Sequence, residues 1–287
     1  PGPGTSGPSA YDRAMSHDDA SDRRPVLPPH VRENERYWNE MAHEWVASGE
    51  RGWADEEPTW GIWGVPEREL GMLPADMTGM RTVELGCGTA YVSAWMARRG
   101  AAVAGIDASE RQLATARRLA ERHGVELDLV RGNAEATPFA SGAFDFAISE
   151  YGAAIWCDPY RWIPEAHRLL KPGGRLVFLA HHPLASVCSP WDGTDLVERL
   201  VRPWFGLHRL DWTEVEVDPG GIEFTLPLSD WMALFRRAGF VVEDLREPRP
   251  AGDVTETRFF ASPDWARRWP SEIVWKLRKV EGPAGLA

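Results

Sequence analysis

The chain has 287 residues, of which 43% are hydrophobic and 26% charged, the proportions of a globular enzyme of one large domain or one domain plus a cap. Its 43 acidic and 32 basic residues give a net charge of −11, which would repel nucleic-acid phosphates, so we expect no nucleic-acid partner. No window approaches the roughly 18 to 20 apolar residues of a membrane helix, and no apolar leader opens the chain, so we expect a cytoplasmic protein with no membrane partner.

The first part of the chain predicts a tail followed by a cap. Residues 1–29 are rich in Pro, Gly, Ser and charge, a composition typical of disorder. Residues 31–46 predict an amphipathic helix, because its large apolar residues fall on one side: Tyr37, Trp38, Met41 and Trp45. Together with the Gly, Pro and Trp-rich stretch that follows, this helix leads us to expect an N-terminal cap over residues 30–80.

Residues 81–182 predict an α/β core. Five short apolar runs, RTVEL, AAVAGID, ELDLV, FDFAIS and RLVFLA, alternate with helical segments at 90–99, from Ser109 onward and near 164–170. This alternation is typical of a parallel sheet with crossover helices. Ser109 and Gln112 form a capping box, and KPGG at 171–174 predicts a turn between a helix and the next strand.

The remainder of the chain predicts a lid and the completion of the sheet. Residues 183–228 have little regular pattern and are rich in Pro, Trp and Gly, as an inserted lid after the fifth strand would be. Residues 229–287 contain a helix at 229–238 ended by Gly239, then two strands, FVVEDL and EIVWKLRKV. We therefore expect a Rossmann-like, mostly parallel sheet of seven strands with flanking helices, an N-terminal helical cap and an inserted lid.

The segment VELGCGTAY, which follows the first predicted strand, indicates a cofactor loop. A dinucleotide site requires G-x-G-x-x-G, whereas this loop has Gly86, Gly88 and then Tyr91 at the third position. Glu84 places a negative charge where two phosphates would lie, and favours a ligand with an ammonium or sulfonium group. An NAD(P)-dependent oxidoreductase is thus disfavoured, although it stays an alternative.

This loop resembles the first motif of the class I S-adenosylmethionine-dependent methyltransferases, V-L-D/E-L-G-C-G-T-G, and the chain is similar to the small-molecule, type 11-like members. The resemblance covers residues 81–180, with several motifs in family order. It implies S-adenosylmethionine as cofactor, with S-adenosylhomocysteine as product. It also implies that Gly86 and Gly88 pack under the methionine and ribose portions and that Glu84 holds the amino group. Ala90 stands where a third glycine is commonest.

Two later motifs extend the expected cofactor site. Asp107 ends the second strand, nineteen residues after Gly88, where a carboxylate accepts hydrogen bonds from a ribose diol in NAD enzymes as well. The segment GNAEATPF is similar to the family's G-D-A-x-x-L-P-F, which implies that Asn133 accepts from the adenine amine and that Ala134 offers its amide. The other predicted cofactor contacts are Tyr37, Trp38, Ala108, Gln112, Glu135 and Ser149.

The end of the fourth predicted strand bears on the reaction. Methyl transfer is an in-line displacement, so it requires positioning, and a base only when the nucleophile arrives protonated. The strand ends in SEYG rather than the N/D-P-P-Y/F/W of enzymes that methylate base amines or glutamine amides, which disfavours that class. Glu150 and Tyr151 lie at the carboxyl edge of the predicted sheet, where open α/β sheets bind ligands, and Tyr151 is a candidate catalytic residue. Alternatively, Tyr151 packs on the cofactor and Glu150 caps a turn.

Three histidines are candidate general bases. His181 and His182 follow the fifth strand at the edge where α/β sheets bind ligands, and imidazole suits proton removal from a phenol, enol or alcohol. Alternatively, one bonds loop backbone and the other is solvated. His43 is a weaker candidate. The three cysteines, Cys87, Cys157 and Cys188, are too far apart for a zinc knuckle or a CxxC pair, so we expect no metal.

Tryptophan is concentrated outside the core, since twelve of the fifteen tryptophans lie before residue 81 or after residue 180. We expect several of these tryptophans to line an apolar or aromatic acceptor cavity. Alternatively, they hold the cap together. The sequence therefore predicts an S-adenosylmethionine-dependent methyltransferase acting on a small, partly apolar or aromatic acceptor, at oxygen before nitrogen. A non-catalytic protein that binds the same cofactor is the alternative. The sequence does not specify the oligomeric state.

Overall fold

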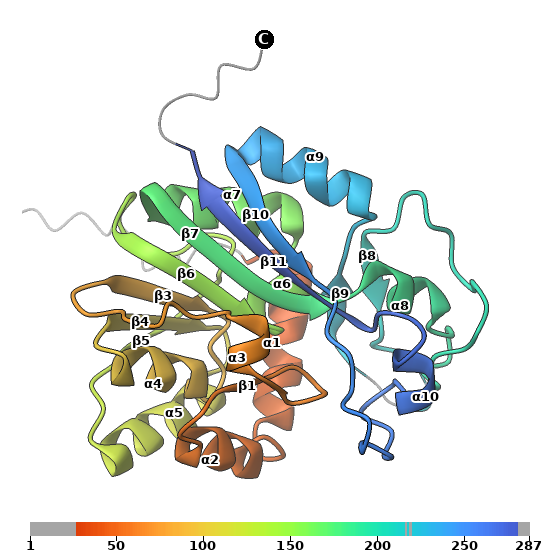
Figure 1. Ribbon diagram of the computed structural model, residues 1–287, viewed down its shortest axis with the longest axis horizontal. Coiled ribbons are helices and arrows are strands. Elements are labelled where there is room, and N and C mark those ends of the chain that lie inside the picture. Colours follow the sequence, from red (N-terminus) through yellow and green to blue (C-terminus); the bar gives the residue numbers. More distant parts are fainter. Residues whose placement is uncertain (1–26, 216, 218–219, 281–287) are drawn as a thin grey trace, which may run out of the picture.

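The computed structural model describes residues 27–215, 217 and 220–280. Within this part, seven strands form one sheet in the order β10-β11-β7-β6-β3-β4-β5 (Figure 1). β11 alone runs in the opposite direction to the other six strands, so the predicted seven-stranded, mostly parallel sheet is confirmed. The strands are β3 (Arg81–Leu85), β4 (Ala102–Asp107), β5 (Asp128–Arg131), β6 (Phe144–Glu150), β7 (Leu170–His181), β10 (Phe240–Arg246) and β11 (Glu272–Lys279).

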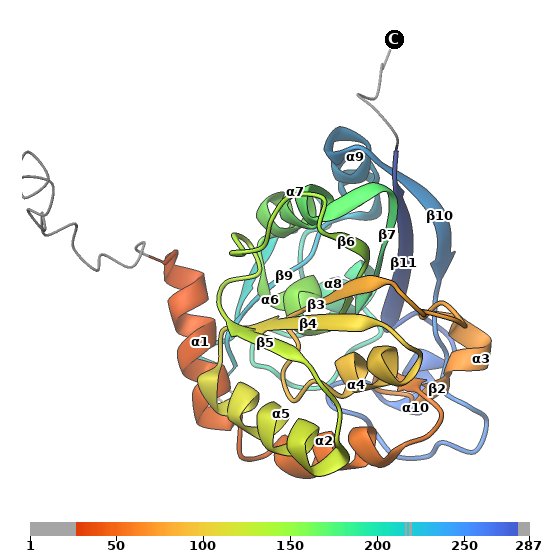
Figure 2. The same ribbon diagram turned by 90° about the vertical axis from the view of Figure 1, so that its left-hand side faces the viewer.

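Helices cover both faces of this sheet (Figure 2). They are α4 (Tyr91–Arg98) and α5 (Glu110–His123) on one face, and α6 (Gly152–Trp156), α7 (Pro159–Leu169) and α9 (Leu228–Ala238) on the other. Alternate residues of β7 enter the two cores, since Phe178 packs with α7 and α9 whereas Val177 packs with α4. This alternation follows from the two-residue period of a strand, and buries both faces as a parallel sheet requires.

Two predicted helix boundaries agree with the structure. The Ser109 side chain accepts a hydrogen bond from the Gln112 N–H at the start of α5. Gly239 ends α9 in the left-handed conformation, with φ 87°. Both are local signals, a cap and a glycine, and each depends only on residues adjacent to the helix end.

Three predicted boundaries are wrong. The helix expected near 164–170 already begins at Pro159, because the Asp158 side chain accepts from the Tyr160 N–H and a proline suits the first turn. The 171–174 segment is no separate turn, since β7 starts at Leu170 and absorbs it as an irregularity in its pairing with β6. The helix expected at 31–46 is interrupted by a turn at 42–45.

The remaining elements lie outside this sheet and the helices that cover it. Residues 1–26 of the predicted tail lie outside the described residues. None of the helices in the described ranges has the length and apolar character that crossing a membrane requires.

The elements outside the seven-stranded sheet and its covering helices are α1 (Pro29–Met41), α2 (Val46–Ala54), β1 (Thr59–Trp60), β2 (Val65–Pro66), α3 (Glu67–Leu70), α8 (Pro183–Cys188), β8 (Arg209–Asp211), β9 (Ile222–Phe224) and α10 (Pro263–Ala266).

Candidate functional site

A cavity of about 970 Å³ opens at the carboxyl ends of β3, β4, β6 and β7. This volume lies at the upper end of the roughly 300–1,000 Å³ of small-molecule sites, and its position is the one at which open α/β sheets bind ligands. Its walls come from the loops after these strands, from α1 and α2, from β8 and the segment before β9, and from residues 258–260. Segments from before and after the core thus enclose one space.

The loop between β3 and α4 lines the cavity with bare backbone. Gly86 has φ 75°, and a Cβ there would lie 2.5 Å from the Ala153 nitrogen, so only glycine lets this loop approach α6. Gly88 has φ 51°, and no atom lies within 4 Å of the place that its Cβ would take. A side chain at Gly88 would project into open space, which is the arrangement of a loop that packs against a ligand.

Asp107 lies beside this loop and also lines the cavity. Its Oδ2 accepts from the Gly88 N–H and its Oδ1 from the Ser109 N–H, both at 2.8 Å. Burial raises the pKa of the carboxyl above its ordinary value, although these two hydrogen bonds act to lower it. Since each carboxylate oxygen has two lone pairs, both can still accept a hydroxyl. Asp107 is therefore held in place to receive a diol.

Glu84, at the end of β3, is a buried acid with no cationic partner in the described part of the chain. Its Oε2 accepts from the Ser93 N–H at 2.9 Å and from the Ser93 hydroxyl at 2.5 Å. Burial, with smaller contributions from Glu150 and Asp107, raises the pKa of Glu84 to about 8. A ligand that carries an ammonium group would stabilise the ionised form.

This raised pKa predicts that the ligand-free protein loses stability as the pH rises. Between the ordinary pKa of 4.5 and about 8, folded Glu84 holds a proton that the unfolded chain has released, so the free energy of unfolding falls across that window. Urea titrations from pH 5 to 8 are expected to show this slope, and Glu84→Gln should make it shallower. Some slope should remain, because burial also raises the pKa of Glu272 to about 7.

The control for this titration is Glu126→Gln, which changes an exposed glutamate. It should leave the slope of the wild-type protein intact. If Glu84→Gln and wild-type protein give superimposable slopes, Glu84 is not the group that titrates.

The wall beyond β4 contains further predicted cofactor contacts, among them the two assigned to the adenine, Asn133 and Ala134. Ala108, Gln112, Asn133 and Ala134 all line the cavity. Asn133 Oδ1 accepts from the Glu135 N–H at 2.9 Å, which shapes the loop. Gln112 Oε1 is buried and has no partner among the described residues, so a donor group of a ligand would satisfy it.

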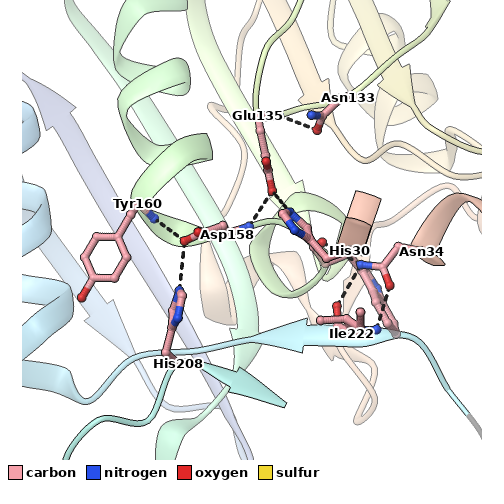
Figure 3. Close-up of polar contacts among 9 residues, drawn as sticks. His30, Asn34, Asn133, Glu135, Asp158, Tyr160, His208 and Ile222 are labelled. Carbon is pink, nitrogen blue, oxygen red and sulfur yellow. Dashed lines mark hydrogen bonds and ion pairs between the residues drawn. The ribbon is translucent and has the colours of Figure 1, made fainter. Parts of the chain in front are cut away.

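Two aromatic side chains of α1 cover this wall. Tyr37 and Trp38 line the cavity and pack on Trp156 of α6, with ring centroids 5.8 and 5.1 Å apart. The helix is fastened by Asn34, whose Nδ2 donates to the Ile222 carbonyl and whose Oδ1 accepts from the Ile222 N–H (Figure 3). α1 and β9 are therefore joined and together cover this side of the cavity.

Glu135 and Ser149 are corrections, because the structure places neither in the cavity lining. Glu135 Oε1 accepts from His30 Nε2 at 2.6 Å and from the Asp158 N–H at 2.8 Å, and so ties α1 to the start of α7 (Figure 3). The Ser149 hydroxyl donates to the Leu85 carbonyl at 2.7 Å and is fully buried. Both side chains support the wall from behind.

Tyr151 lines the cavity at the end of β6, and its backbone has φ 55° and ψ −47°. Such a conformation is strained for a residue with a side chain, and is found mostly at functional sites. Its hydroxyl donates to the buried carboxylate of Glu272. Burial raises the pKa of the phenol well above its ordinary value, which favours the protonated form of Tyr151.

Of the two histidines at the end of β7, His181 lines the cavity and His182 does not. His181 Nδ1 lies 3.6 Å from Glu223 Oε2, and the ring packs edge-on against Tyr151 and Phe260. His182 is a correction: it is buried outside the lining, where its Nδ1 accepts from the Leu184 N–H. Burial lowers the pKa of His182 to about 4, so it is a neutral helix cap.

His43, the weaker candidate, does not line the cavity, and 75% of its side chain is exposed. The tryptophans divide between the two predicted roles. Four line the cavity, whereas Trp53 and Trp60 are fully buried and hold the cap together. The four are Trp38, Trp45, Trp156 and Trp212.

Several cavity residues escaped the sequence analysis. Glu150 was placed at the ligand-binding edge without an assigned role, and the structure shows that its carboxylate lines the cavity and accepts from the Tyr91 hydroxyl at 2.6 Å. Phe259 and Phe260 belong to the loop between β10 and α10, where Phe259 stacks on Trp45 with centroids 6.1 Å apart. An adjacent aromatic pair in a charged loop was the signal that could have found them.

The site consists of a glycine loop, an acid at a strand end and a covered cavity. Comparisons with known proteins agree with this geometry. Residues 83–178, a third of the chain, match the methyltransferase domain family. A crystal structure of an S-adenosylmethionine-dependent methyltransferase from Mesorhizobium loti has a TM-score of 0.61 and 25% identity, covering 76% of this chain and all of that one. The chain therefore carries a class I S-adenosylmethionine-dependent methyltransferase domain.

Two curated relatives resemble the same region. A ubiquinone biosynthesis O-methyltransferase from Ruegeria pomeroyi is 39% identical over 113 residues, which are 39% of this chain and 45% of that protein. A malonyl-[acyl-carrier protein] O-methyltransferase from Pectobacterium atrosepticum is 33% identical over 139 residues, 47% of this chain and 53% of that protein. The chain thus spans about half the length of these relatives.

Proposed function

We propose that this protein transfers a methyl group from S-adenosylmethionine to a hydroxyl oxygen of a small, partly apolar or aromatic acceptor. The observation that carries the proposal is one continuous cavity, which runs from the glycine loop and Asp107 to His181 and a set of aromatic side chains. The O-methyltransferase names of both curated relatives support oxygen as the acceptor atom. The net charge of −11 supports a small molecule rather than a nucleic acid.

The side chains at the donor end fit S-adenosylmethionine. Gly86 and Gly88 offer bare backbone, Asp107 has free lone pairs for the ribose hydroxyls, and buried Glu84 lacks a cation that the amino group would supply. When bound, the cofactor supplies a methyl group activated by the sulfonium. Across the described residues, no group of histidine, cysteine and acidic side chains is placed to hold a metal ion.

The protein's own contribution is to position the acceptor, exclude water and remove a proton. His181 is the proposed base. Glu223 beside Nδ1 favours the tautomer that carries its proton there, which leaves Nε2 to accept the proton of the hydroxyl. Apolar and aromatic neighbours, among them Leu210 and Phe260, form a surface that an aromatic acceptor would bury.

Calorimetry with S-adenosylhomocysteine and with NADH tests the donor. We expect binding of the first alone, and binding of NADH alone would instead support an oxidoreductase. A screen of phenols, enols, alcohols and amines with labelled methyl donor then tests the acceptor. Tight S-adenosylhomocysteine binding without transfer to any compound would support the non-catalytic alternative.

Replacing Asp107 by alanine is expected to weaken S-adenosylhomocysteine binding by about 1–3 kcal/mol, or about 5- to 150-fold, because the ribose loses a charged acceptor. Calorimetry measures the change. Asp145→Ala is the matched control, since Asp145 also accepts a backbone N–H, from Arg81, but lies at the opposite end of β6. Equal affinities for Asp107→Ala and wild-type protein would refute the placement of the ribose.

A further inference from the structure

Glu150 belongs to a row of three acids that line the cavity. Asp107, Glu84 and Glu150 lie at or near the carboxyl ends of β4, β3 and β6, three adjacent strands of the sheet. The proposed function assigns the ribose to Asp107 and the amino group to Glu84. Glu150 stands on the far side of Glu84 from the ribose, next to β7 and His181. That is the side on which the proposed base lies.

The contacts of Glu150 hold its carboxylate still without neutralising it. Oε1 accepts from the Gly61 N–H at 2.8 Å, and Oε2 accepts from the Tyr91 hydroxyl at 2.6 Å. The Tyr91 ring is in turn fixed edge-on against Trp95, with centroids 5.1 Å apart. No lysine, arginine or histidine of the described chain forms an ion pair with Glu150.

This environment makes the charge of Glu150 costly in the ligand-free cavity. Burial raises the pKa of its carboxyl, and Glu84 and Glu272 are close enough for their charges to interact with it. A partly buried carboxylate without a cation is stabilised when a ligand brings a positive charge close to it. The proposed function pairs the amino group of the methyl donor with Glu84. The second positive charge of the donor is the sulfonium, which is therefore available to Glu150.

We propose that Glu150 recognises the positive charge at the sulfonium, so that the cavity discriminates the methyl donor from S-adenosylhomocysteine, whose sulfur is neutral. This inference rests on the proposed function, since it presupposes that the cavity binds the methyl donor. Its consequence is that the product loses an attraction that the donor had. Tyr91, which breaks the dinucleotide pattern in the sequence, serves here to orient the carboxylate.

Calorimetry with three ligands tests the inference: S-adenosylmethionine, S-adenosylhomocysteine and sinefungin, in which a carbon bearing an amino group replaces the methylated sulfur. In Glu150→Gln, affinity for the two ligands charged at this position should fall about 5- to 50-fold, while affinity for S-adenosylhomocysteine stays within about twofold. Glu84→Gln is the matched control, and should weaken all three ligands alike because all three have the amino group.

Tyr91→Phe separates charge from hydrogen bonding, because it removes the donor and keeps the carboxylate. The ratio of donor to product affinity should remain within about twofold of the wild-type ratio. S-adenosylhomocysteine binding also reports that each variant is folded.

Three results would overturn the inference. The first is a Glu150→Gln variant that weakens all three ligands equally, and the second is one that weakens none. The third needs no variant, and is wild-type protein that binds S-adenosylhomocysteine at least about tenfold more tightly than S-adenosylmethionine and sinefungin. If wild-type protein binds none of the three ligands, the proposed function itself fails, which is a distinct result.

Discussion

Replacing His181 by alanine is expected to lower the turnover rate by about 10²- to 10⁴-fold, the usual contribution of a general base. Affinity for S-adenosylhomocysteine should stay within about twofold, because His181 lies among acceptor-side residues rather than at the glycine loop. The measurement is single-turnover transfer of labelled methyl, using whichever acceptor the screen identifies. Glu223→Gln should give a smaller loss, since it removes the partner of Nδ1 and retains the imidazole.

His43→Ala is the control for this experiment, because His43 is exposed and lies outside the cavity lining. It should have the wild-type rate. A rate for His181→Ala that matches the wild-type rate would remove His181 as a base, and would indicate an acceptor that arrives already deprotonated.

The Gly86→Ala substitution should destabilise the fold by about 2–5 kcal/mol. Alanine at φ 75° carries the cost of the left-handed region, and its Cβ would overlap backbone atoms of Gly152 and Ala153 that cannot move independently. Urea unfolding monitored by tryptophan fluorescence measures this loss.

The neighbouring Gly88→Ala provides the comparison, because its Cβ would meet nothing and only the φ of 51° carries a cost, about 1 kcal/mol. The main effect of Gly88→Ala should be on S-adenosylhomocysteine affinity, since the methyl group would occupy the wall of the cavity. If both variants had the same stability, the close approach of the loop to α6 would not be the reason for glycine at position 86.

The glycine-loop end of the cavity could be predicted from the sequence because the residues that form it act locally. Gly86, Gly88 and Asp107 follow strands directly, and parallel strands bring their carboxyl ends to one edge of the sheet. Their roles also depend little on side-chain orientation. The glycines act through backbone atoms, and an acid at the end of a strand can adopt few orientations.

The acceptor half could not be predicted, because it depends on contacts between distant segments. Glu150 contacts Tyr91 across 59 residues, and His181 lies beside Glu223 because β9 packs close to the end of β7. Strand alternation separates His181 from His182, and that alternation was not applied beyond the end of the predicted strand. Glu135 was assigned to the cofactor, because its partner His30 lies 105 residues away.

The enclosure of one cavity by different segments has a consequence for how such proteins diversify. The match to the methyltransferase domain family ends at residue 178, whereas His181, Glu223 and Phe260 all come later in the chain. Under the proposed function, a change confined to these later segments would alter the acceptor and leave the residues proposed to bind the donor in place. Similarity over residues 83–178 therefore bears on the donor, whereas the acceptor has to be inferred from the later segments.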